Sequence, residues 1–329
     1  MISTGGTLAS SHSENGMSPQ LHSEDIRKKI SGLTEGFTVD QEEMFMIDSS
    51  NMQPEEWEAL SERIYQRRSD YDGIVVLHGT DTLAYTASAL SFALQKIGIP
   101  VVLTGSQVSI ENPIADATEN CRAALHMAAS GCPGVYVAFN RKIIMGTRAS
   151  KVRTRSFDAF ESVNYPYAAR IDSSGLVLNP FVHAARGGSC HLANRFCKEV
   201  FLLKIYPGIS PDIFGKLQEM GIRGVYVEGF GIGGLPFSLT ESIGKAVERG
   251  MIVAVGSQCL YEGSDFSLYE VGRQVLDCGV IETGNMTTEA AVTKLMWTLG
   301  QYDNPARIHS VMKTNLLGEL GSVMDWNQN

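Results

Sequence analysis

The sequence predicts an α/β protein in which a doubly wound, mostly parallel sheet forms a larger N-terminal domain and a smaller α/β domain follows. Three observations lead to this prediction. Short apolar runs, typical of strands buried on both faces of a sheet, alternate with helical patterns along the chain. Polar turns follow these runs, as they do at the carboxyl ends of parallel strands. The 329 residues, 43% of them hydrophobic and 19% charged, suffice for one large or two moderate domains with a sizeable core.

The first half opens with a glycine motif and then alternates regularly between strands and helices. Only three residues precede Thr4-Gly5-Gly6-Thr7, so the opening strand is either very short or begins upstream of Met1. The polar, glycine-containing stretch 10–20 is expected to form a mobile loop. The elements expected after it are a short helix over 21–30, strands over 44–47, 73–77, 100–103, 134–139 and 142–145, and helices over 55–68, 83–97 and 115–129.

The second half repeats the alternation on a smaller scale. Residues 181–196 lack clear periodicity and contain Gly187-Gly188, so we expect a linker over 186–198 between domains over 1–185 and 199–329. The elements expected beyond the linker are strands over 200–205, 224–227 and 251–255 and helices over 211–220, 239–249 and 287–299. This order of elements predicts a flavodoxin-like, doubly wound N-terminal domain and a smaller C-terminal α/β domain.

Composition and charge narrow the class of protein. The net charge of −9 argues against a nucleic-acid or anionic-membrane partner. No apolar run approaches the roughly 18 residues that span a bilayer. No basic and apolar signal sequence follows Met1, so the six cysteines are expected to be reduced thiols. We therefore expect a cytoplasmic enzyme.

The most informative polar turn is His78-Gly79-Thr80-Asp81-Thr82, between the strand over 73–77 and the next helix. It places two hydroxyls and a carboxylate at the carboxyl end of a strand, where open α/β sheets bind ligands. Helix-start amides nearby favour negative charge. Thr80 and Asp81 could equally serve as N-caps of the following helix. The turn alone does not decide between a helix cap and an active site.

Two other turns and a basic segment supply polar groups that could join this one. Thr7 and Asp48-Ser49-Ser50 also follow strands, and in a parallel sheet such turns share one edge. The basic segment 146–155 adds Lys151, which could exchange a proton with Asp81 and a neighbouring threonine. A small, hydroxyl-rich pocket suits a zwitterionic amino acid better than a phosphate, since the chain has neither a P-loop nor GxGxxG.

These residues resemble the signatures of bacterial L-asparaginases, in particular their cytoplasmic type I branch. Thr4-Gly5-Gly6-Thr7-Leu8-Ala9 and His78-Gly79-Thr80-Asp81-Thr82 are similar to the two signature motifs of that family. The segments 48–52, 146–151, 160–166 and 286–290 match as well, so the resemblance covers essentially the whole chain. A single TGGT motif carries little information, whereas two motifs with the serine turn and the lysine in order are specific.

The resemblance implies a reaction and a role for each matching residue. Thr7 would be the nucleophile on the side-chain amide carbon of L-asparagine, forming an acyl-enzyme that water hydrolyses to L-aspartate. Thr80, Asp81 and Lys151 would form a second triad that moves protons. The substrate would be bound by Asp48, Ser49, Ser50, Thr80 and Asp81. Backbone amides near Thr80 would stabilise the oxyanion. No metal or organic cofactor would be needed, and the chain would assemble as a homodimer or homotetramer.

One position departs from the family pattern, and three alternatives remain open. Many members carry a tyrosine ten residues beyond the nucleophile, where this chain has Met17. An asparaginase–glutaminase is one alternative, because a single methylene contributes only about 1–3 kcal/mol of discrimination. A tRNA-dependent amidotransferase component uses the same motifs but would be expected to carry an additional N-terminal domain. A non-catalytic amino-acid sensor on the same fold is the third alternative.

For the remaining candidates we expect structural roles. His78 is expected to stabilise its turn rather than act as a base. Cys190, His191 and Cys197 have a spacing that fits no zinc pattern, so we expect them to be surface or packing residues.

Overall fold

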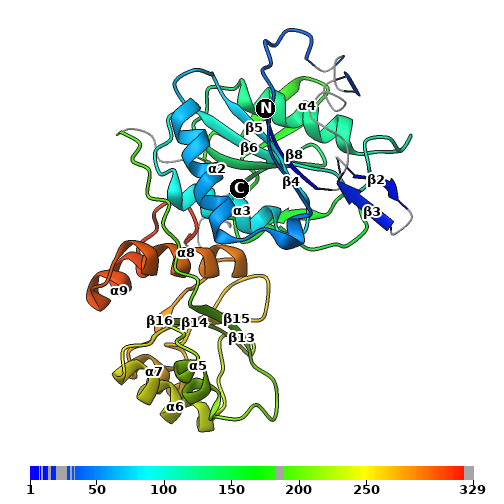
Figure 1. Ribbon diagram of the computed structural model, residues 1–329. Coiled ribbons are helices and arrows are strands. Elements are labelled where there is room, and N and C mark those ends of the chain that lie inside the picture. The colour runs from blue at the N-terminus through cyan, green and yellow to red at the C-terminus, as the bar shows by residue number, and fades with distance from the viewer. Residues whose placement is uncertain are drawn as a thin grey trace. The chain divides into compact units, whose positions relative to one another are not determined.

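The computed structural model describes residues 1–6, 8, 10–13, 16–19, 28–29, 32, 34–182 and 189–321. The chain divides into two compact units, each drawn in Figure 1. The first unit comprises Met1–Ser162 and Pro166–Asn194, and the second comprises Val163–Tyr165 and Arg195–Asn329. Of the expected linker, residues 186–188 lie outside the described residues, 189–194 belong to the first unit, and 195–198 belong to the second.

Among the described residues, the first unit is built on an eight-stranded sheet with the order β12-β11-β8-β7-β6-β5-β1-β4. The strands are β1 (Ile2–Gly5), β4 (Glu42–Ile47), β5 (Ile74–Leu77), β6 (Pro100–Thr104), β7 (Gly134–Phe139), β8 (Lys142–Met145), β11 (Ala169–Asp172) and β12 (Gly175–Leu178). In sheet order, the strands β4, β1, β5, β6 and β7 are parallel. Strands β8, β11 and β12 extend the sheet beyond β7 in antiparallel pairs. Numbered in chain order, the parallel strands follow the flavodoxin order 2-1-3-4-5, which confirms the predicted fold class.

The central strands of the first unit appear as apolar runs in the sequence because they are buried in the sheet. All four residues of β5 are buried, as expected for a strand covered on both faces. Helices α3 (Leu83–Ala93) and α4 (Ala117–Ala128) pack on β6 and β7, and α2 (Pro54–Arg67) packs on α3. α2 begins with Pro54 at its first turn, where the missing N–H costs nothing. No helix in the described part of the chain is long and apolar enough to cross a membrane.

The stretch 10–20, expected to be a loop, contains two paired strands instead. β2 (Ser10–Ser13) and β3 (Gly16–Pro19) are antiparallel. Their residues are mostly polar and show no apolar alternation, so the pairing of the two backbones left no signal in the sequence. Most of the short helix expected over 21–30 lies outside the described residues.

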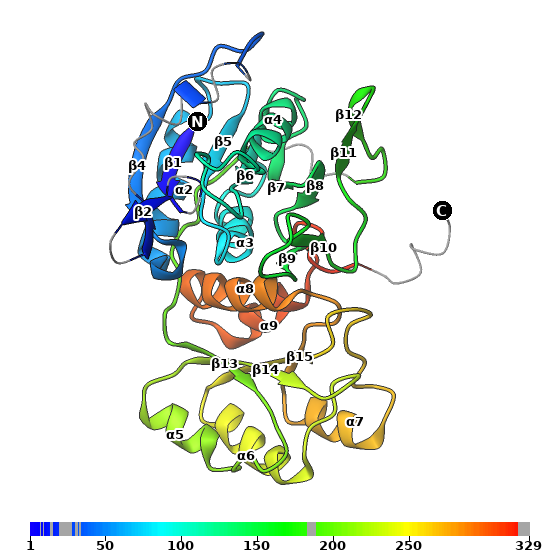
Figure 2. The same cartoon turned by 90° about the vertical axis from the view of Figure 1, so that its right-hand side faces the viewer.

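The second unit is a smaller α/β structure, as predicted, and it has helices on both faces of its sheet. Its parallel strands lie in the order β13 (Val200–Lys204), β14 (Gly224–Gly229), β15 (Ile252–Ser257) and β16 (Ile281–Glu282). Its helices are α5 (Ile213–Glu219), α6 (Phe237–Glu248), α7 (Glu270–Asp277), α8 (Thr288–Gln301) and α9 (Pro305–Lys313). Figure 2 shows α8 and α9 on one side of this sheet and α5, α6 and α7 on the other.

Alternate side chains along the strands of the second unit point to opposite faces of the sheet and contribute to two apolar clusters. Val225 and Val227 of β14 belong to the apolar cluster formed with α5, α6 and α7. Tyr226, between them, belongs to the cluster formed with α8 and α9. Successive side chains of a strand point to opposite faces, so a single buried strand contributes to two cores.

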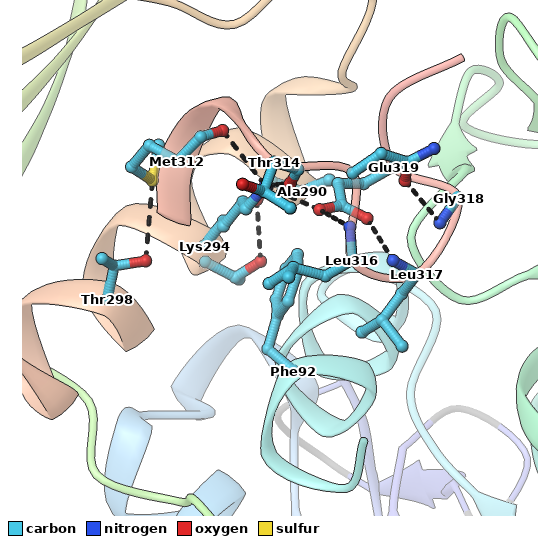
Figure 3. A network of polar contacts seen from close by, with 12 residues as sticks. Phe92, Ala290, Lys294, Thr298, Met312, Thr314, Leu316, Leu317, Gly318 and Glu319 are labelled. Carbon is cyan, nitrogen blue, oxygen red and sulfur yellow. Dashed lines mark hydrogen bonds and ion pairs between the residues drawn. The ribbon is translucent and has the colours of Figure 1, made fainter. Parts of the chain in front are cut away.

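Within the second unit, Lys294 of α8 holds the segment that follows α9 (Figure 3). Lys294 and Glu319 have no exposed side-chain surface, and their Nζ and Oε1 atoms lie 2.6 Å apart. Burial lowers the pKa of Lys294, against the opposing effect of the Glu319 charge. The ammonium also donates to the carbonyls of Met312 (3.1 Å) and Thr314 (2.6 Å), and the carboxylate accepts from the amides of Leu316 (3.0 Å) and Leu317 (2.7 Å).

A second polar cluster ties residues 163–165 to the rest of the second unit. The side-chain amide of Asn164 donates to the carbonyls of Leu260 (3.4 Å) and Asn285 (3.2 Å). Its side-chain oxygen accepts the amide of Glu262 at 2.8 Å. One side chain therefore fixes two loops of the second unit.

Candidate active site

The candidate site lies where the order of the parallel strands reverses. From β1 the sheet continues through β4 on one side and through β5 on the other. Gly5 is the last residue of β1 and Gly6 follows it, and the turn holding Thr80 follows β5, so two adjacent strands end in the candidate motifs. Ligands of open α/β sheets bind in the crevice at such a reversal.

Glycines allow the backbones of these turns to touch. A Cβ atom on Gly6 would lie 2.3 Å from the Cα atom of Gly79, and one on Gly79 would lie 2.5 Å from Ser49 Oγ. A Cβ atom on Gly105, in the turn after β6, would lie 2.2 Å from the carbonyl oxygen of His78. Because only hydrogen fits at these positions, four turns pack at a distance that no other residue type permits.

The serine turn is a short 3₁₀ helix over Ser49–Asn51, capped by Asp48. Asp48 Oδ1 accepts the amide of Ser50 at 2.9 Å and its hydroxyl at 2.7 Å, and these bonds lower the pKa of Asp48. Ser49 is buried, and its Oγ accepts the amide of Asp81 at 3.3 Å. Its carbonyl accepts the hydroxyl of Thr82 at 2.7 Å. The serine turn is therefore bonded directly to the turn after β5.

Lys151 brings together the two polar residues of the turn after β5. It is the last residue of β9 (Ala149–Lys151), which pairs with β10 (Phe160–Ser162). Its Nζ lies 2.8 Å from Thr80 Oγ1 and 2.7 Å from Asp81 Oδ1. Thr80 is buried, whereas the Asp81 side chain is 63% exposed. A hydroxyl, an ammonium and an accessible carboxylate in direct contact can pass a proton among themselves.

The alternative that Thr80 and Asp81 cap the following helix is wrong. The N-cap of α3 is Thr82, and its side chain makes no capping bond. Thr80 Oγ1 and Asp81 Oδ1 are engaged by Lys151 instead. The geometry therefore favours the interpretation of this turn as part of a site.

His78 has the structural role expected of it. Its ring is completely buried, with Nδ1 2.7 Å from the carbonyl of Gly79 and Nε2 3.0 Å from the hydroxyl of Thr86. Trp57 Nε1 donates to the same hydroxyl at 3.0 Å. Burial lowers the pKa of His78 to about 4, so the ring is neutral near pH 7. Nδ1 donates to the carbonyl, and the ring braces the turn.

Gln107, in the turn after β6, also reaches Thr80, although the sequence indicated no role for it. Thr80 Oγ1 donates to Gln107 Oε1 at 3.4 Å, and Gln107 Nε2 donates to the carbonyl of Ser156 at 3.0 Å. The available signal was only that Gln107 belongs to another polar turn after a parallel strand. Its partner Ser156 lies 49 residues away, so the contact depends on the fold.

Two residues singled out in the sequence are not covered by the described part of the structure. Thr7 lies outside the described residues, as does the side chain of Met17. The described residues contain no group of three or more His, Cys, Asp or Glu side chains that could hold a metal ion. Cys190 and Cys197 are both free thiols.

Comparison with known proteins covers almost the entire chain. The family profile "Asparaginase, N-terminal" matches residues 1–180, and "Glutaminase/Asparaginase C-terminal domain" matches residues 199–312. The chain is 38% identical to an L-asparaginase of Thermococcus kodakarensis, over 97% of this chain and 98% of the relative. It is 34% identical to one subunit of the glutamyl-tRNA(Gln) amidotransferase of Methanosphaera stadtmanae, over 99% of this chain and 77% of the relative. The solved structure of the thermostable L-asparaginase from Thermococcus kodakarensis matches with a TM-score of 0.91 and 39% identity, and the match covers 98% of each chain.

Proposed function

The chain belongs to the asparaginase family and is a hydrolase of that type, and from this premise we propose that it hydrolyses the side-chain amide of L-asparagine to L-aspartate and ammonia. The observation that carries the proposal is the contact of Lys151 Nζ with both Thr80 Oγ1 and Asp81 Oδ1. This contact lies at the strand-order reversal, beside the Gly5-Gly6 turn that precedes Thr7.

The proposed reaction has two steps. In the first, the Thr7 hydroxyl attacks the amide carbon, an ester to Thr7 forms, and the C–N bond breaks as the hydroxyl proton of Thr7 passes to the nitrogen, which leaves as ammonia. In the second, water attacks the ester carbon and gives one proton to Thr80, while Thr80 gives its own proton to Lys151 and Lys151 gives one to the Asp81 carboxylate. The bond from the ester carbon to Thr7 breaks, and the proton held by Asp81 returns to the Thr7 oxygen through the same groups. The proton route is supported by the 2.8 Å distance between Lys151 Nζ and Thr80 Oγ1.

The proposed substrate contacts follow from which groups are already engaged. Lys151 occupies Asp81 Oδ1, so the second oxygen of this exposed carboxylate can accept the α-ammonium group of the substrate. Asp48 holds the serine turn through the Ser50 amide, and the Ser50 hydroxyl, which donates to Asp48 in the structure, is proposed to turn and donate to the α-carboxylate when the substrate binds. The Asp81 amide donates to Ser49 Oγ, so the oxyanion donor is proposed to be another amide of this turn.

Two broader assignments also remain proposals. We place the chain in the cytoplasmic type I branch because the whole pattern of matching segments, from residues 4–9 to 286–290, resembles that branch. We also expect it to assemble as a homodimer or homotetramer, which light scattering of the purified chain measures directly.

The second candidate is an amidotransferase-type or glutaminase activity, which the similarity to the glutamyl-tRNA(Gln) amidotransferase favours. The test is ammonia release from L-asparagine and L-glutamine by the purified full chain, with a Thr7→Ala variant as the blank. A kcat/KM for asparagine at least about 10-fold above that for glutamine supports the asparaginase, since one methylene contributes about 1–3 kcal/mol. The reverse preference selects the second candidate. A wild type that releases ammonia from neither amide excludes both and leaves the sensor.

A further inference from the structure

We propose that Gln107 is a positioning residue that holds the Thr80 hydroxyl and the Lys151-bearing hairpin in one fixed geometry. The inference rests on the proposed function and adds a residue to its proton route. Gln107 acts through Thr80, on one side, and through Ser156, on the other.

The contacts close a ring around Thr80. Lys151 Nζ donates to Thr80 Oγ1 at 2.8 Å, and Thr80 Oγ1 donates to Gln107 Oε1 at 3.4 Å. Gln107 Nε2 then donates at 3.0 Å to the carbonyl of Ser156, which belongs to the loop between β9 and β10. Since Lys151 ends β9, the ring returns to the hairpin from which it started. Gln107 therefore ties Thr80 to this hairpin by a second route, independent of the Lys151 side chain.

The backbone of Gln107 is itself firmly held. Its amide donates to both oxygens of Asp116, at 3.0 and 3.1 Å. The Asn120 side chain, which has no exposed surface, donates to Asp116 Oδ2 and to the carbonyl of Gly105, both at 2.9 Å. The turn after β6 is thus pinned at two points by residues at the start of α4, and a side chain that projects from it has a fixed origin.

The direction of these bonds selects one orientation of the Thr80 hydroxyl. A threonine hydroxyl has one proton, and an ammonium can only donate, so Lys151 must be met by a lone pair of Thr80 Oγ1. The Ser156 carbonyl can only accept, so Gln107 must direct its amide nitrogen there and its oxygen toward Thr80. The Thr80 proton is consequently directed to Gln107. The 3.4 Å length makes this bond easy to break when Thr80 passes its proton on.

Loss of the Gln107 oxygen should therefore slow turnover without weakening substrate binding. An interaction that orients the proton-transfer group contributes to the transition state, so its removal lowers kcat and kcat/KM together. A contact with the substrate itself would raise KM at unchanged kcat. The two roles are separated by the same kinetic measurement.

The test compares Gln107→Met with Gln95→Met, using ammonia release from L-asparagine. Methionine has a similar length and removes both side-chain bonds. Gln95 lies just after α3, and its side-chain amide donates to the Phe92 carbonyl at 3.2 Å, so its variant makes the same chemical change away from the site. We expect Gln107→Met to lower kcat about 10-fold or more, with KM changed less than about 3-fold. Gln95→Met should stay within about 2-fold of the wild type in both parameters.

A second arm places the Gln107→Met change in a Thr80→Ser background. Threonine restricts its own χ1 rotation because it is branched at Cβ, whereas serine does not. The orientation of the residue 80 hydroxyl should then depend more on Gln107. The factor by which Gln107→Met lowers kcat should therefore be at least about 5 times larger in the Thr80→Ser background than in the wild type. A purely structural role would leave the two losses equal and would show as a reduced melting temperature.

Several results would overturn the inference. They are a Gln107→Met kcat equal to that of Gln95→Met, a rise in KM alone, or equal losses in both backgrounds. A wild type that releases no ammonia from asparagine overturns the proposed function and this inference with it. An active wild type whose kcat is unchanged by Gln107→Met overturns only the role of Gln107, so the two failures can be told apart.

Discussion

Replacing Lys294 by methionine would leave the Glu319 carboxylate without its counter-ion and with no exposed surface. Breaking a buried pair in this way costs about 3–5 kcal/mol. The Met312 and Thr314 carbonyls would also lose this donor, at about 1–3 kcal/mol each when they stay dry. Because Glu319 can take up a proton and water can reach part of the site, we expect a total loss of about 4–6 kcal/mol in the free energy of unfolding of the second unit.

The assay is urea unfolding followed by tryptophan fluorescence, to which Trp297, buried in α8, contributes. With a urea dependence of about 1–3 kcal/mol per molar, the midpoint should fall by about 2 M. The control is Lys245→Met in the same unit, where the lysine pairs with Glu241 and both side chains are more than half exposed. That variant should keep the wild-type midpoint.

A double variant, Lys294→Met with Glu319→Met, sharpens the reasoning. Many buried ion pairs can be replaced by apolar residues at no cost. Here the pair also satisfies two backbone carbonyls and two backbone amides, so the double variant should remain clearly less stable than the wild type. A loss below about 1 kcal/mol in the single variant, or full recovery in the double variant, would refute this account of the pair.

Three further predictions concern the first unit. Lys151→Met should lower kcat for ammonia release by about 10³-fold or more, because Nζ contacts Thr80 and Asp81. The melting temperature should stay near that of the wild type. Near-normal activity would remove Lys151 from the proton route. The pKa of His78 is about 4 in the folded chain and about 6.5 in the unfolded chain, so the folded chain binds this proton less readily. The contribution of His78 to stability is therefore present above pH 6.5 and is lost as the pH falls toward 4. Melting temperatures measured across that range should fall more steeply for the wild type than for His78→Asn. Gly6→Ala should yield insoluble or inactive protein because of the 2.3 Å approach to Gly79, whereas Gly98→Ala, at a similar positive φ but with open space around it, should remain soluble and active.

The parts of the fold that were predictable are those with a strong local pattern. The β5 strand is a continuous apolar run followed by a polar turn, and both features were readable. The helix α9 was missed although Asn304 caps it and Pro305 opens it, because only nine residues carry its periodicity. The two-residue strand β16 has no pattern of its own and exists through its pairing with β15.

The candidate site shows the same division between local and distant information. Thr80 and Asp81 were selected from the polar turn after a strand, Lys151 from the basic segment, and the family resemblance gave all three their roles. The fold brings them within hydrogen-bonding distance although Lys151 is 71 residues from Thr80 and 70 from Asp81. The role of Thr7 as nucleophile stays a prediction. Gln107 was missed because neither of its partners, Thr80 and Ser156, is near it in sequence.

The Asn164 cluster has a consequence for dissecting the chain. The three residues Val163–Tyr165 belong to the second unit, yet they interrupt the first unit in sequence. A fragment that begins at residue 195 would lack Asn164, and the loops that contain Leu260 and Glu262 would lose their shared partner. Conversely, a fragment that ends at 194 would carry Asn164 without the groups it bonds. Neither unit can be excised with a single cut, so a clean separation would need the 163–165 tripeptide supplied in trans or grafted through a circular permutation.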